Sequence, residues 1–308
     1  MNTTPSWGDV ARPGDAPSPD RPGPLTVRVV DDAAAAEGLR EEWDELADAS
    51  GAGPFARPDY GLAWWRHLGH GRLLVATVRF HGRLVALAPL HERRVGPLTV
   101  ARWLGHGLGT IAEPVVRPGH ERAAGVLLQH LATPRRVLDL VECRESLPGL
   151  PALQQLPRRT TTAAPRDRCP VADIDPADPL AHLALREHKS MRTSLAARQR
   201  RIERAGLQMR MEVAETAEHL DALLPDLLAV FDAAEAGHPR QHLLRPPWGG
   251  FVLDYLRETL EQGRSVVLLG YLDDRPFTLS TRRCSGPARS RSGSVGTTRP
   301  PASSGPAT

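Results

Sequence analysis

Apolar residues recur along the chain with two spacings, and the two spacings alternate from one stretch to the next. Runs in which every second residue is apolar predict strands, and runs with apolar residues three or four positions apart predict helices with one buried face. In the helix expected at residues 34–49, for example, Leu39, Trp43 and Leu46 fall on one side. The first half is predicted to contain strands at residues 25–30, 73–80, 83–91, 99–104, 112–116 and 137–140 and helices at residues 34–49, 58–68 and 121–131.

The second half continues this alternation after a connection at residues 148–170 that is rich in Pro, Thr and Arg. A long basic helix is expected at residues 179–205, and a helical stretch at residues 219–236 is expected to break or restart at Pro225. The other predicted elements are strands at residues 171–174, 207–213, 265–272 and 276–280 and a helix at residues 248–262. Because helices and strands alternate throughout, we expect an α/β protein, an α+β arrangement with a mixed sheet, in two halves at residues 25–147 and 171–280.

One predicted hairpin in each half aligns with the other without a gap. The turns His81-Gly82 and Asp273-Asp274 lie 192 positions apart, and the same offset relates Gly71 to Gly263. An amphipathic helix precedes each hairpin. The similarity favours duplication of one α/β module, and the alternative is that two copies of a common helix–hairpin unit arose independently.

The two ends of the chain differ in composition from the parts between them. Residues 1–24 are rich in Pro, Gly and Asp, and residues 281–308 are almost wholly Ser, Arg, Gly, Pro, Thr and Ala, with Val295 the only branched aliphatic residue. Neither segment offers enough apolar surface to build a core, so we expect a disordered leader and a disordered tail. Because the tail begins inside a predicted hairpin, a frameshift or truncation near Arg282 is our hypothesis; a natural linker is the alternative.

Composition narrows the class of protein. The chain has 308 residues, 41% of them hydrophobic and 24% charged, and it has no apolar run long enough to span a bilayer. Three widely spaced cysteines argue against a disulfide framework and against a zinc site built on cysteine. The N-terminus lacks the apolar stretch of a signal peptide, so we expect a cytoplasmic protein. The sequence does not indicate an oligomeric state.

Several segments together resemble a known family. The most specific is the basic stretch 189–206, which resembles the Ser-Lys-x-x-Arg-x-x-Leu…Arg-Arg-Leu-Glu-x-x-Gly element of the BioF2-like, or CelD-like, acetyltransferase domain of the GNAT superfamily. This domain is similar in layout to Fem-type tandem transferases. Further matching residues are Trp43, Leu46, Pro54, Phe55, Pro58, Trp64, Trp65, the stretch Ala86–Leu90, Leu104, Gly105, Glu113, Pro114, Asp139 and Leu140.

The resemblance implies tandem GNAT-like halves, of which the second is incomplete. It implies acetyl-CoA or another acyl-CoA as co-substrate and a small-molecule amine or a glycan as acceptor, with a link to polysaccharide metabolism in some members. In GNAT proteins backbone N–H groups of a loop that enters a helix bind the pyrophosphate, and this element should follow the hairpin at residues 265–280. The sequence shows none there, so the alternative is a catalytically inactive, truncated GNAT-like binding protein.

The basic helix supplies the candidate ligand-binding residues. Its cations recur three positions apart, which places Arg186 with Lys189 and Arg192 and places Arg198 with Arg201 and Arg204. Lys189, Arg192, Arg198 and Arg201 are therefore candidates for binding the phosphates of CoA or an anionic glycan. The alternative is a solvated charged face backed by Leu185, Leu195 and Ile202. Nucleic-acid binding is not expected, because no aromatic residues interleave with the arginines.

Other motifs carry weaker signals. Gly105–Thr110 is rich in glycine and suits either a phosphate cradle or, more simply, a turn between strands. His238 and His242 are four positions apart, but Pro239 interrupts any helix there, so no metal site is expected. Asp232, Glu235 and Glu113 are conceivable general bases, and equally conceivable exposed carboxylates, so the catalytic residues stay unknown.

Overall fold

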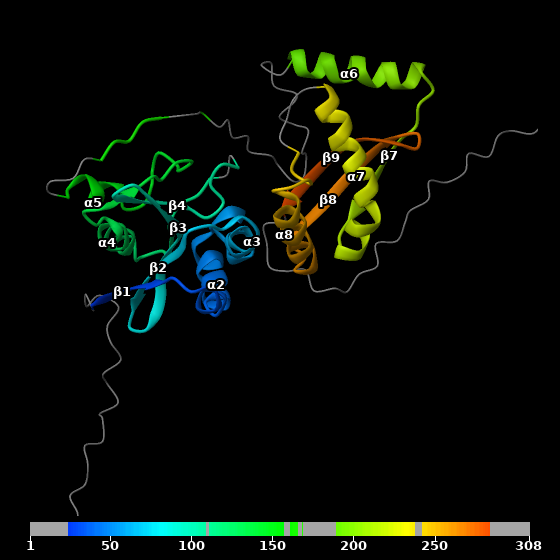
Figure 1. The fold of residues 1–308 in the computed structure, drawn as a ribbon. Helices are drawn as coiled ribbons and strands as arrows, with labels where there is room; N and C mark the ends of the chain where they lie inside the picture. The colour runs from blue at the N-terminus through cyan, green and yellow to red at the C-terminus, as the bar shows by residue number, and fades with distance from the viewer. Residues whose placement is uncertain are drawn as a thin grey trace, which may run out of the picture. The chain divides into compact units, whose positions relative to one another are not determined.

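The structure is a computed structural model that describes residues 24–108, 111–156, 161–165, 168, 189–237 and 242–283. The chain divides into two compact units, residues 1–168 and 169–308, which we call unit 1 and unit 2 and describe separately (Figure 1). The expected leader apart from residue 24, the expected strand 171–174, the first part of the basic helix and the tail from residue 284 lie outside the described residues. No helix in the described ranges is both long and apolar enough to cross a membrane.

Unit 1 alternates helices and strands as the hydrophobic pattern predicts. The helix expected at residues 34–49 is, however, two helices, separated by a turn at Gly38 and Leu39. The helices are α1 (Ala33–Glu37), α2 (Arg40–Ser50), α3 (Pro58–Leu68), α4 (Arg122–Leu131) and α5 (Leu150–Gln154), with a 3₁₀ turn at Pro54–Ala56. The strands are β1 (Leu25–Val30), β2 (Arg72–Phe80), β3 (Arg83–Val95), β4 (Leu98–Trp103), β5 (Val115–Val116) and β6 (Arg136–Leu138).

The sheet of unit 1 is mixed and is covered on both faces. Its order is β1-β2-β3-β4-β6, with β5 also paired to β3, and all pairings are antiparallel except β4 with β6. Figure 1 shows α4 and α5 on the opposite side of the sheet from α2 and α3. Most residues of β2 and of β3 are therefore buried, which explains why these strands have continuous apolar runs in the sequence.

The described part of unit 2 has three helices and a three-stranded sheet. Its helices are α6 (Lys189–Arg204), α7 (Ala217–Gly237) and α8 (Gly249–Glu261), and its strands are β7 (Met209–Ala214), β8 (Ser265–Leu272) and β9 (Arg275–Arg283), in the order β7-β8-β9. The core lies on one face of this sheet, where Val267, Leu269 and Tyr271 of β8 pack against apolar residues of α7 and α8.

The predicted break at Pro225 is wrong, since α7 is continuous through that residue. Pro225 is exposed, whereas Leu223 and Leu227 on either side of it are buried. The carbonyl that loses its hydrogen bond to the proline therefore faces water, and the buried leucines hold both parts of the helix on the core.

The first strands of the two units pair in the same register. Leu25 of β1 faces Phe80 of β2, and Met209 of β7 faces Leu272 of β8, the position that aligns with Phe80 at the offset of 192. The irregularity in each hairpin also falls at one aligned place, after Val78 in unit 1 and after Gly270 in unit 2. Both predicted hairpins are thus confirmed, and they share their register and their bulge.

The first helix after each opening strand is also capped alike. The Asp32 side chain accepts a hydrogen bond from the N–H of Ala35 at the start of α1, and the Thr216 hydroxyl accepts one from His219 at the start of α7. Each cap lies two residues beyond the end of its strand, at Val30 and Ala214. The two units therefore repeat a strand, a capped helix and a bulged hairpin in one order.

Candidate active site

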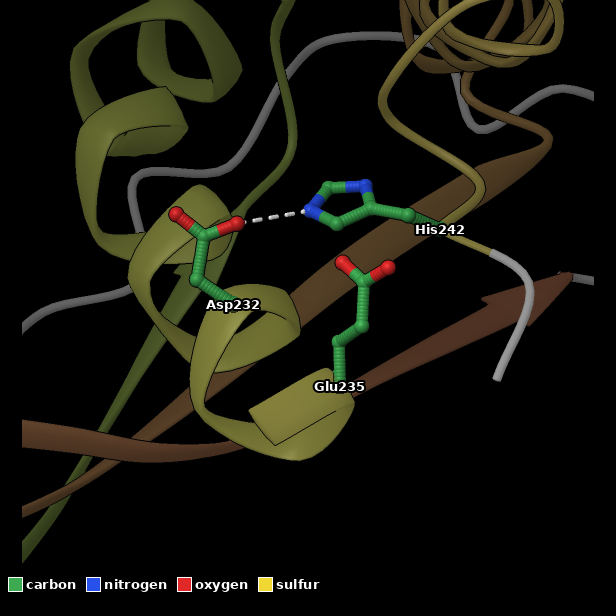
Figure 2. Close-up of side chains that lie close together, drawn as sticks. All are labelled: Asp232, Glu235 and His242. Atoms are coloured by element: carbon green, nitrogen blue, oxygen red, sulfur yellow. Dashed lines mark hydrogen bonds and ion pairs between the residues drawn. The ribbon is translucent and has the colours of Figure 1, made fainter. Parts of the chain in front are cut away.

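A cluster of ionisable side chains lies at the C-terminal end of α7. Asp232 and Glu235 stand three positions apart on this helix and so point from the same side of it, and His242 reaches them from the segment before α8 (Figure 2). The potential ligand atoms of the three side chains all lie within 4.8 Å of one another. Asp232 and Glu235 were both conceivable general bases from the sequence. The structure places them beside His242, a residue that the sequence analysis did not connect with them.

Hydrogen bonds fix the arrangement of this cluster. His242 Nε2 lies 3.0 Å from Asp232 Oδ1, and an Arg245 N–H donates to the same oxygen at 2.7 Å. Because a carboxylate only accepts, His242 donates this hydrogen bond from Nε2. The histidine side chain is 5% exposed and packs against the Phe231 ring, whereas both carboxylates are exposed.

The cluster suits proton transfer better than cation binding. A metal ion would compete for Asp232 Oδ1 with two hydrogen-bond donors, one of them the positive guanidinium of Arg245. The carboxylate of Glu235, by contrast, is exposed and stands beside the imidazole of His242 (Figure 2). An exposed carboxylate beside an imidazole can accept a proton from an approaching amine.

The third carboxylate proposed from the sequence lies in unit 1, where Arg144 approaches Glu113 at 3.1 Å. This carboxylate belongs to an ion pair within unit 1. His238, the predicted neighbour of His242, lies outside the described residues.

The four basic candidates all lie on α6, in which no residue is buried. At about 100° of rotation per residue, Lys189 and Arg192 share one side of the helix, and Arg198 and Arg201 point about 180° away. One phosphate group can therefore engage one pair or the other. The apolar backing expected from Leu195 is missing, because this side chain is 47% exposed.

The glycine-rich segment 105–110 is a turn, as far as residue 108 where its description stops. Gly105 has a φ of +86°, and a Cβ at this position would lie 2.2 Å from the Tyr60 ring. Glycine is thus required for the close approach of the turn to α3, which accounts for the motif without a phosphate.

Sequence reasoning missed a histidine cluster in unit 1. His91 of β3 is buried, its Nε2 lies 3.2 Å from His106 Nδ1, and the Trp64 ring packs 5.0 Å from it. Burial, with a further contribution from the neighbouring His106, lowers the pKa of His91 to about 4, so the ring is neutral at pH 7. The only sign of this cluster in the sequence was a histidine within an apolar strand. Its partners His106 and Trp64 lie in other segments, so no local pattern links them to His91.

Comparison with known proteins relates most of the described part of unit 2 to one type of domain. No curated protein and no solved structure gave a match. The mixed α/β arrangement of helices and sheet is consistent with a GNAT-like fold. Residues 189–278, from the start of α6 into β9, match the family model described as the acetyltransferase (GNAT) domain.

Proposed function

We propose that the chain is an N-acyltransferase of the GNAT type, which transfers an acyl group from acyl-CoA to an amine or sugar acceptor. The match of residues 189–278 to the acetyltransferase domain carries this proposal. GNAT domains use acyl-CoA as co-substrate. An acceptor in polysaccharide metabolism, a cytoplasmic location and two GNAT-like halves follow from the resemblance to the CelD-like domain and belong to the same proposal.

The cluster at the end of α7 supplies the proton acceptor in this proposal. The acceptor nitrogen attacks the thioester carbonyl carbon, a C–N bond forms, and the C–S bond breaks to release CoA as its thiolate. Glu235 takes the proton that the nitrogen loses and returns it to the thiolate through solvent. His242 and Arg245 hold Asp232 beside Glu235, so the local negative charge is partly balanced by the two donors.

Helix α6 supplies the phosphate contacts. Lys189, Arg192, Arg198 and Arg201 project from a helix without buried residues, where a flexible phosphate-bearing ligand can reach them. Arginine suits this role because its planar guanidinium donates two parallel hydrogen bonds to phosphate oxygens. The pair Lys189–Arg192 and the pair Arg198–Arg201 would serve different phosphate groups, since they lie on opposite sides of the helix.

A second candidate function is a non-catalytic GNAT-like binding protein. In unit 1, β3 pairs with β4 and β5 beyond the hairpin, whereas in the described part of unit 2 the aligned strand β9 pairs with β8 alone. A truncated second half, which we expect from the sequence, is part of this candidate function. Such a chain would bind acyl-CoA or an acceptor without completing the reaction.

Calorimetry and a transfer assay separate the two functions. Acetyl-CoA should release or absorb heat on binding the full chain, and free thiol should appear when an amine panel is added. Glu235→Gln should lower kcat by about 10²- to 10⁴-fold with little change in acetyl-CoA affinity, because it removes the proton acceptor. The control is Glu218→Gln, a glutamate in the first turn of the same helix and far along it from the cluster.

Each outcome points to one interpretation. Heat with thiol release that depends on Glu235 supports the enzyme. Heat without thiol release supports the binding protein. No heat at millimolar acetyl-CoA contradicts both, and equal loss of activity in the two glutamine variants removes Glu235 from the mechanism.

A further inference from the structure

Within the described residues, the sheet of unit 2 leaves one apolar face uncovered. Met209, Met211 and Val213 of β7 and Phe277 of β9 are exposed on it, with the half-buried Val266 and Leu268 of β8 between them. We call these six residues the open face. Met209 is 63% exposed and Met211 51%, although both belong to a strand that pairs fully with its neighbour.

The aligned face in unit 1 shows what such a surface normally contacts. Leu25, Val27 and Val29 take the positions of Met209, Met211 and Val213, and they pack against the core that α4 builds on β2 and β3. The residue types are apolar in both units, so the open face is built for burial under a helix. Contiguous exposed apolar surface of this kind marks an interaction site.

Helix α6 carries the complementary surface. Met191, Leu195 and Ile202 fall within about 40° of one another around the helix, and we call them the α6 stripe. Met191 is 48% and Leu195 47% exposed, so the stripe contacts little of the described chain. At 16 residues the helix is about 24 Å long, which matches the roughly 20 Å of the six-residue strand β7.

The α6 stripe does not cover the open face of its own chain, although four residues separate α6 from β7. Both surfaces thus suit another molecule, and one molecule that carries both is a second copy of this chain. We propose that the chain forms a two-fold dimer in which α6 of each copy packs on the open face of the other.

The surface area is sufficient for a weak dimer. Three strands about 4.8 Å apart and about 20 Å long give a face of roughly 300 Å². Two-fold symmetry makes the contact twice, and each contact buries a sheet face and a helix side, so about 1,200 Å² is removed from water, at the lower limit of stable interfaces.

The dimer does not depend on acyl transfer. Lys189 lies about 140° around the helix from the middle of the stripe, so it stays outside the interface. Arg198 borders the stripe, and its long side chain can run along the apolar surface with its guanidinium in water.

Sedimentation equilibrium of the full chain tests the dimer. The wild type should dissociate in the micromolar range, whereas Leu195→Lys and Met211→Glu should each weaken dimerisation by at least about tenfold, because each buries a charge in both contacts. Leu98→Lys is the matched control, since Leu98 is an exposed leucine in β4 of unit 1. It should leave the dissociation constant unchanged.

A mixture of the two charged variants shows whether α6 packs on the open face of another copy or on that of its own chain. In a mixed dimer the lysine introduced on α6 of one copy meets the glutamate introduced on β7 of the other, and the second contact is unaltered. Mixing should therefore restore dimers that neither variant forms alone. A wild type that stays monomeric throughout, or a mixture that stays monomeric after each single variant has lost its dimers, overturns the proposal. Because both substituted side chains are exposed, circular dichroism should show folded protein in every case.

Discussion

Units 1 and 2 share a strand register but differ, in the residues that the structure describes, in how many faces of the sheet are covered. In unit 1 the strand β2 lies between α4 on one side and the α2–α3 side on the other, and its residues are buried in both directions. In unit 2 the aligned strand β8 has a core on one side and half-exposed Val266 and Leu268 on the other. One packed face of the sheet is therefore enough to fix the strand register and the bulge of the hairpin. Helices on the second face add stability and solubility.

The largest expected difference between the units is in the free energy of unfolding that each loses when one aligned side chain is truncated to alanine. Leu74 is 1% exposed in the core that α4 completes, and Val266 lies at the aligned position on the open face. Leu74→Ala should destabilise unit 1 by about 2–5 kcal/mol, because it leaves a cavity between sheet and helix. At concentrations where the chain is monomeric, Val266→Ala should cost less than about 1 kcal/mol, because its site is then partly in water.

Urea unfolding followed by peptide-resolved hydrogen exchange measures the two units in the same chain. The unit that a variant leaves unchanged serves as the internal reference for that variant. Equal losses for Leu74→Ala and Val266→Ala would show that the open face is covered in solution, and dilution would then reveal whether a second copy covers it.

The pH dependence of stability should also separate the units. His91 has its pKa lowered to about 4 by burial and by His106, with His70 and Arg102 nearby. The unfolded chain takes up a proton near pH 6.5 and the folded unit near pH 4, so stability is complete above pH 6.5 and falls as the pH drops towards 4. The loss amounts to no more than about 3 kcal/mol.

Unit 2 should respond at the opposite end of the pH scale. Burial and a hydrogen bond from its hydroxyl to Asp226 raise the pKa of Tyr271 to about 12. Its contribution is complete below pH 10 and is lost as the pH rises from 10 towards 12. Hydrogen exchange across the pH range checks both signs; His91→Gln should flatten the acid loss in unit 1, and an unchanged slope in that variant would contradict the assignment.

Sequence reasoning located most of the elements because apolar spacing follows from burial. The hairpins at His81-Gly82 and Asp273-Asp274 were predictable from local turn chemistry and alternation. It failed at Pro225, where buried leucines on both sides hold the helix together despite the proline. The turn between α1 and α2 was missed because apolar spacing indicates the buried face of a helix and not where it ends, and the backbone at Gly38 keeps a helical φ of −63°.

The candidate site was less predictable than the fold. Asp232 and Glu235 were conceivable bases because of their chemistry alone, and nothing in their spacing indicated His242 as a partner. The histidine arrives from a different segment, and only the turn before α8 brings its Nε2 to 3.0 Å from Asp232. Contacts between distant segments carry no periodic signal, which is also why the pair His91 and His106 was missed.

The smallest expected difference between the units is in the stability gained when a residue of each hairpin turn is replaced by glycine. His81 has a φ of +48° and Asp273 a φ of +53°, in the left-handed region that costs a residue with a Cβ about 1 kcal/mol. His81→Gly should therefore stabilise unit 1 by about 0.5–1 kcal/mol. Asp273→Gly should have almost no net effect, because Asp273 Oδ1 accepts a hydrogen bond from the Gln208 N–H at 2.9 Å, and losing that bond offsets the relief of strain.

Asp273→Asn separates the two contributions in unit 2. Asparagine tolerates the left-handed conformation and keeps an oxygen that accepts from Gln208, so this variant should be at least as stable as the wild type. Thermal unfolding of the three variants measures the differences. If Asp273→Gly gains as much stability as His81→Gly, the side-chain bond to Gln208 contributes nothing, and only the backbone bond from the Asp273 N–H to the Gln208 carbonyl links the turn to the residue before β7.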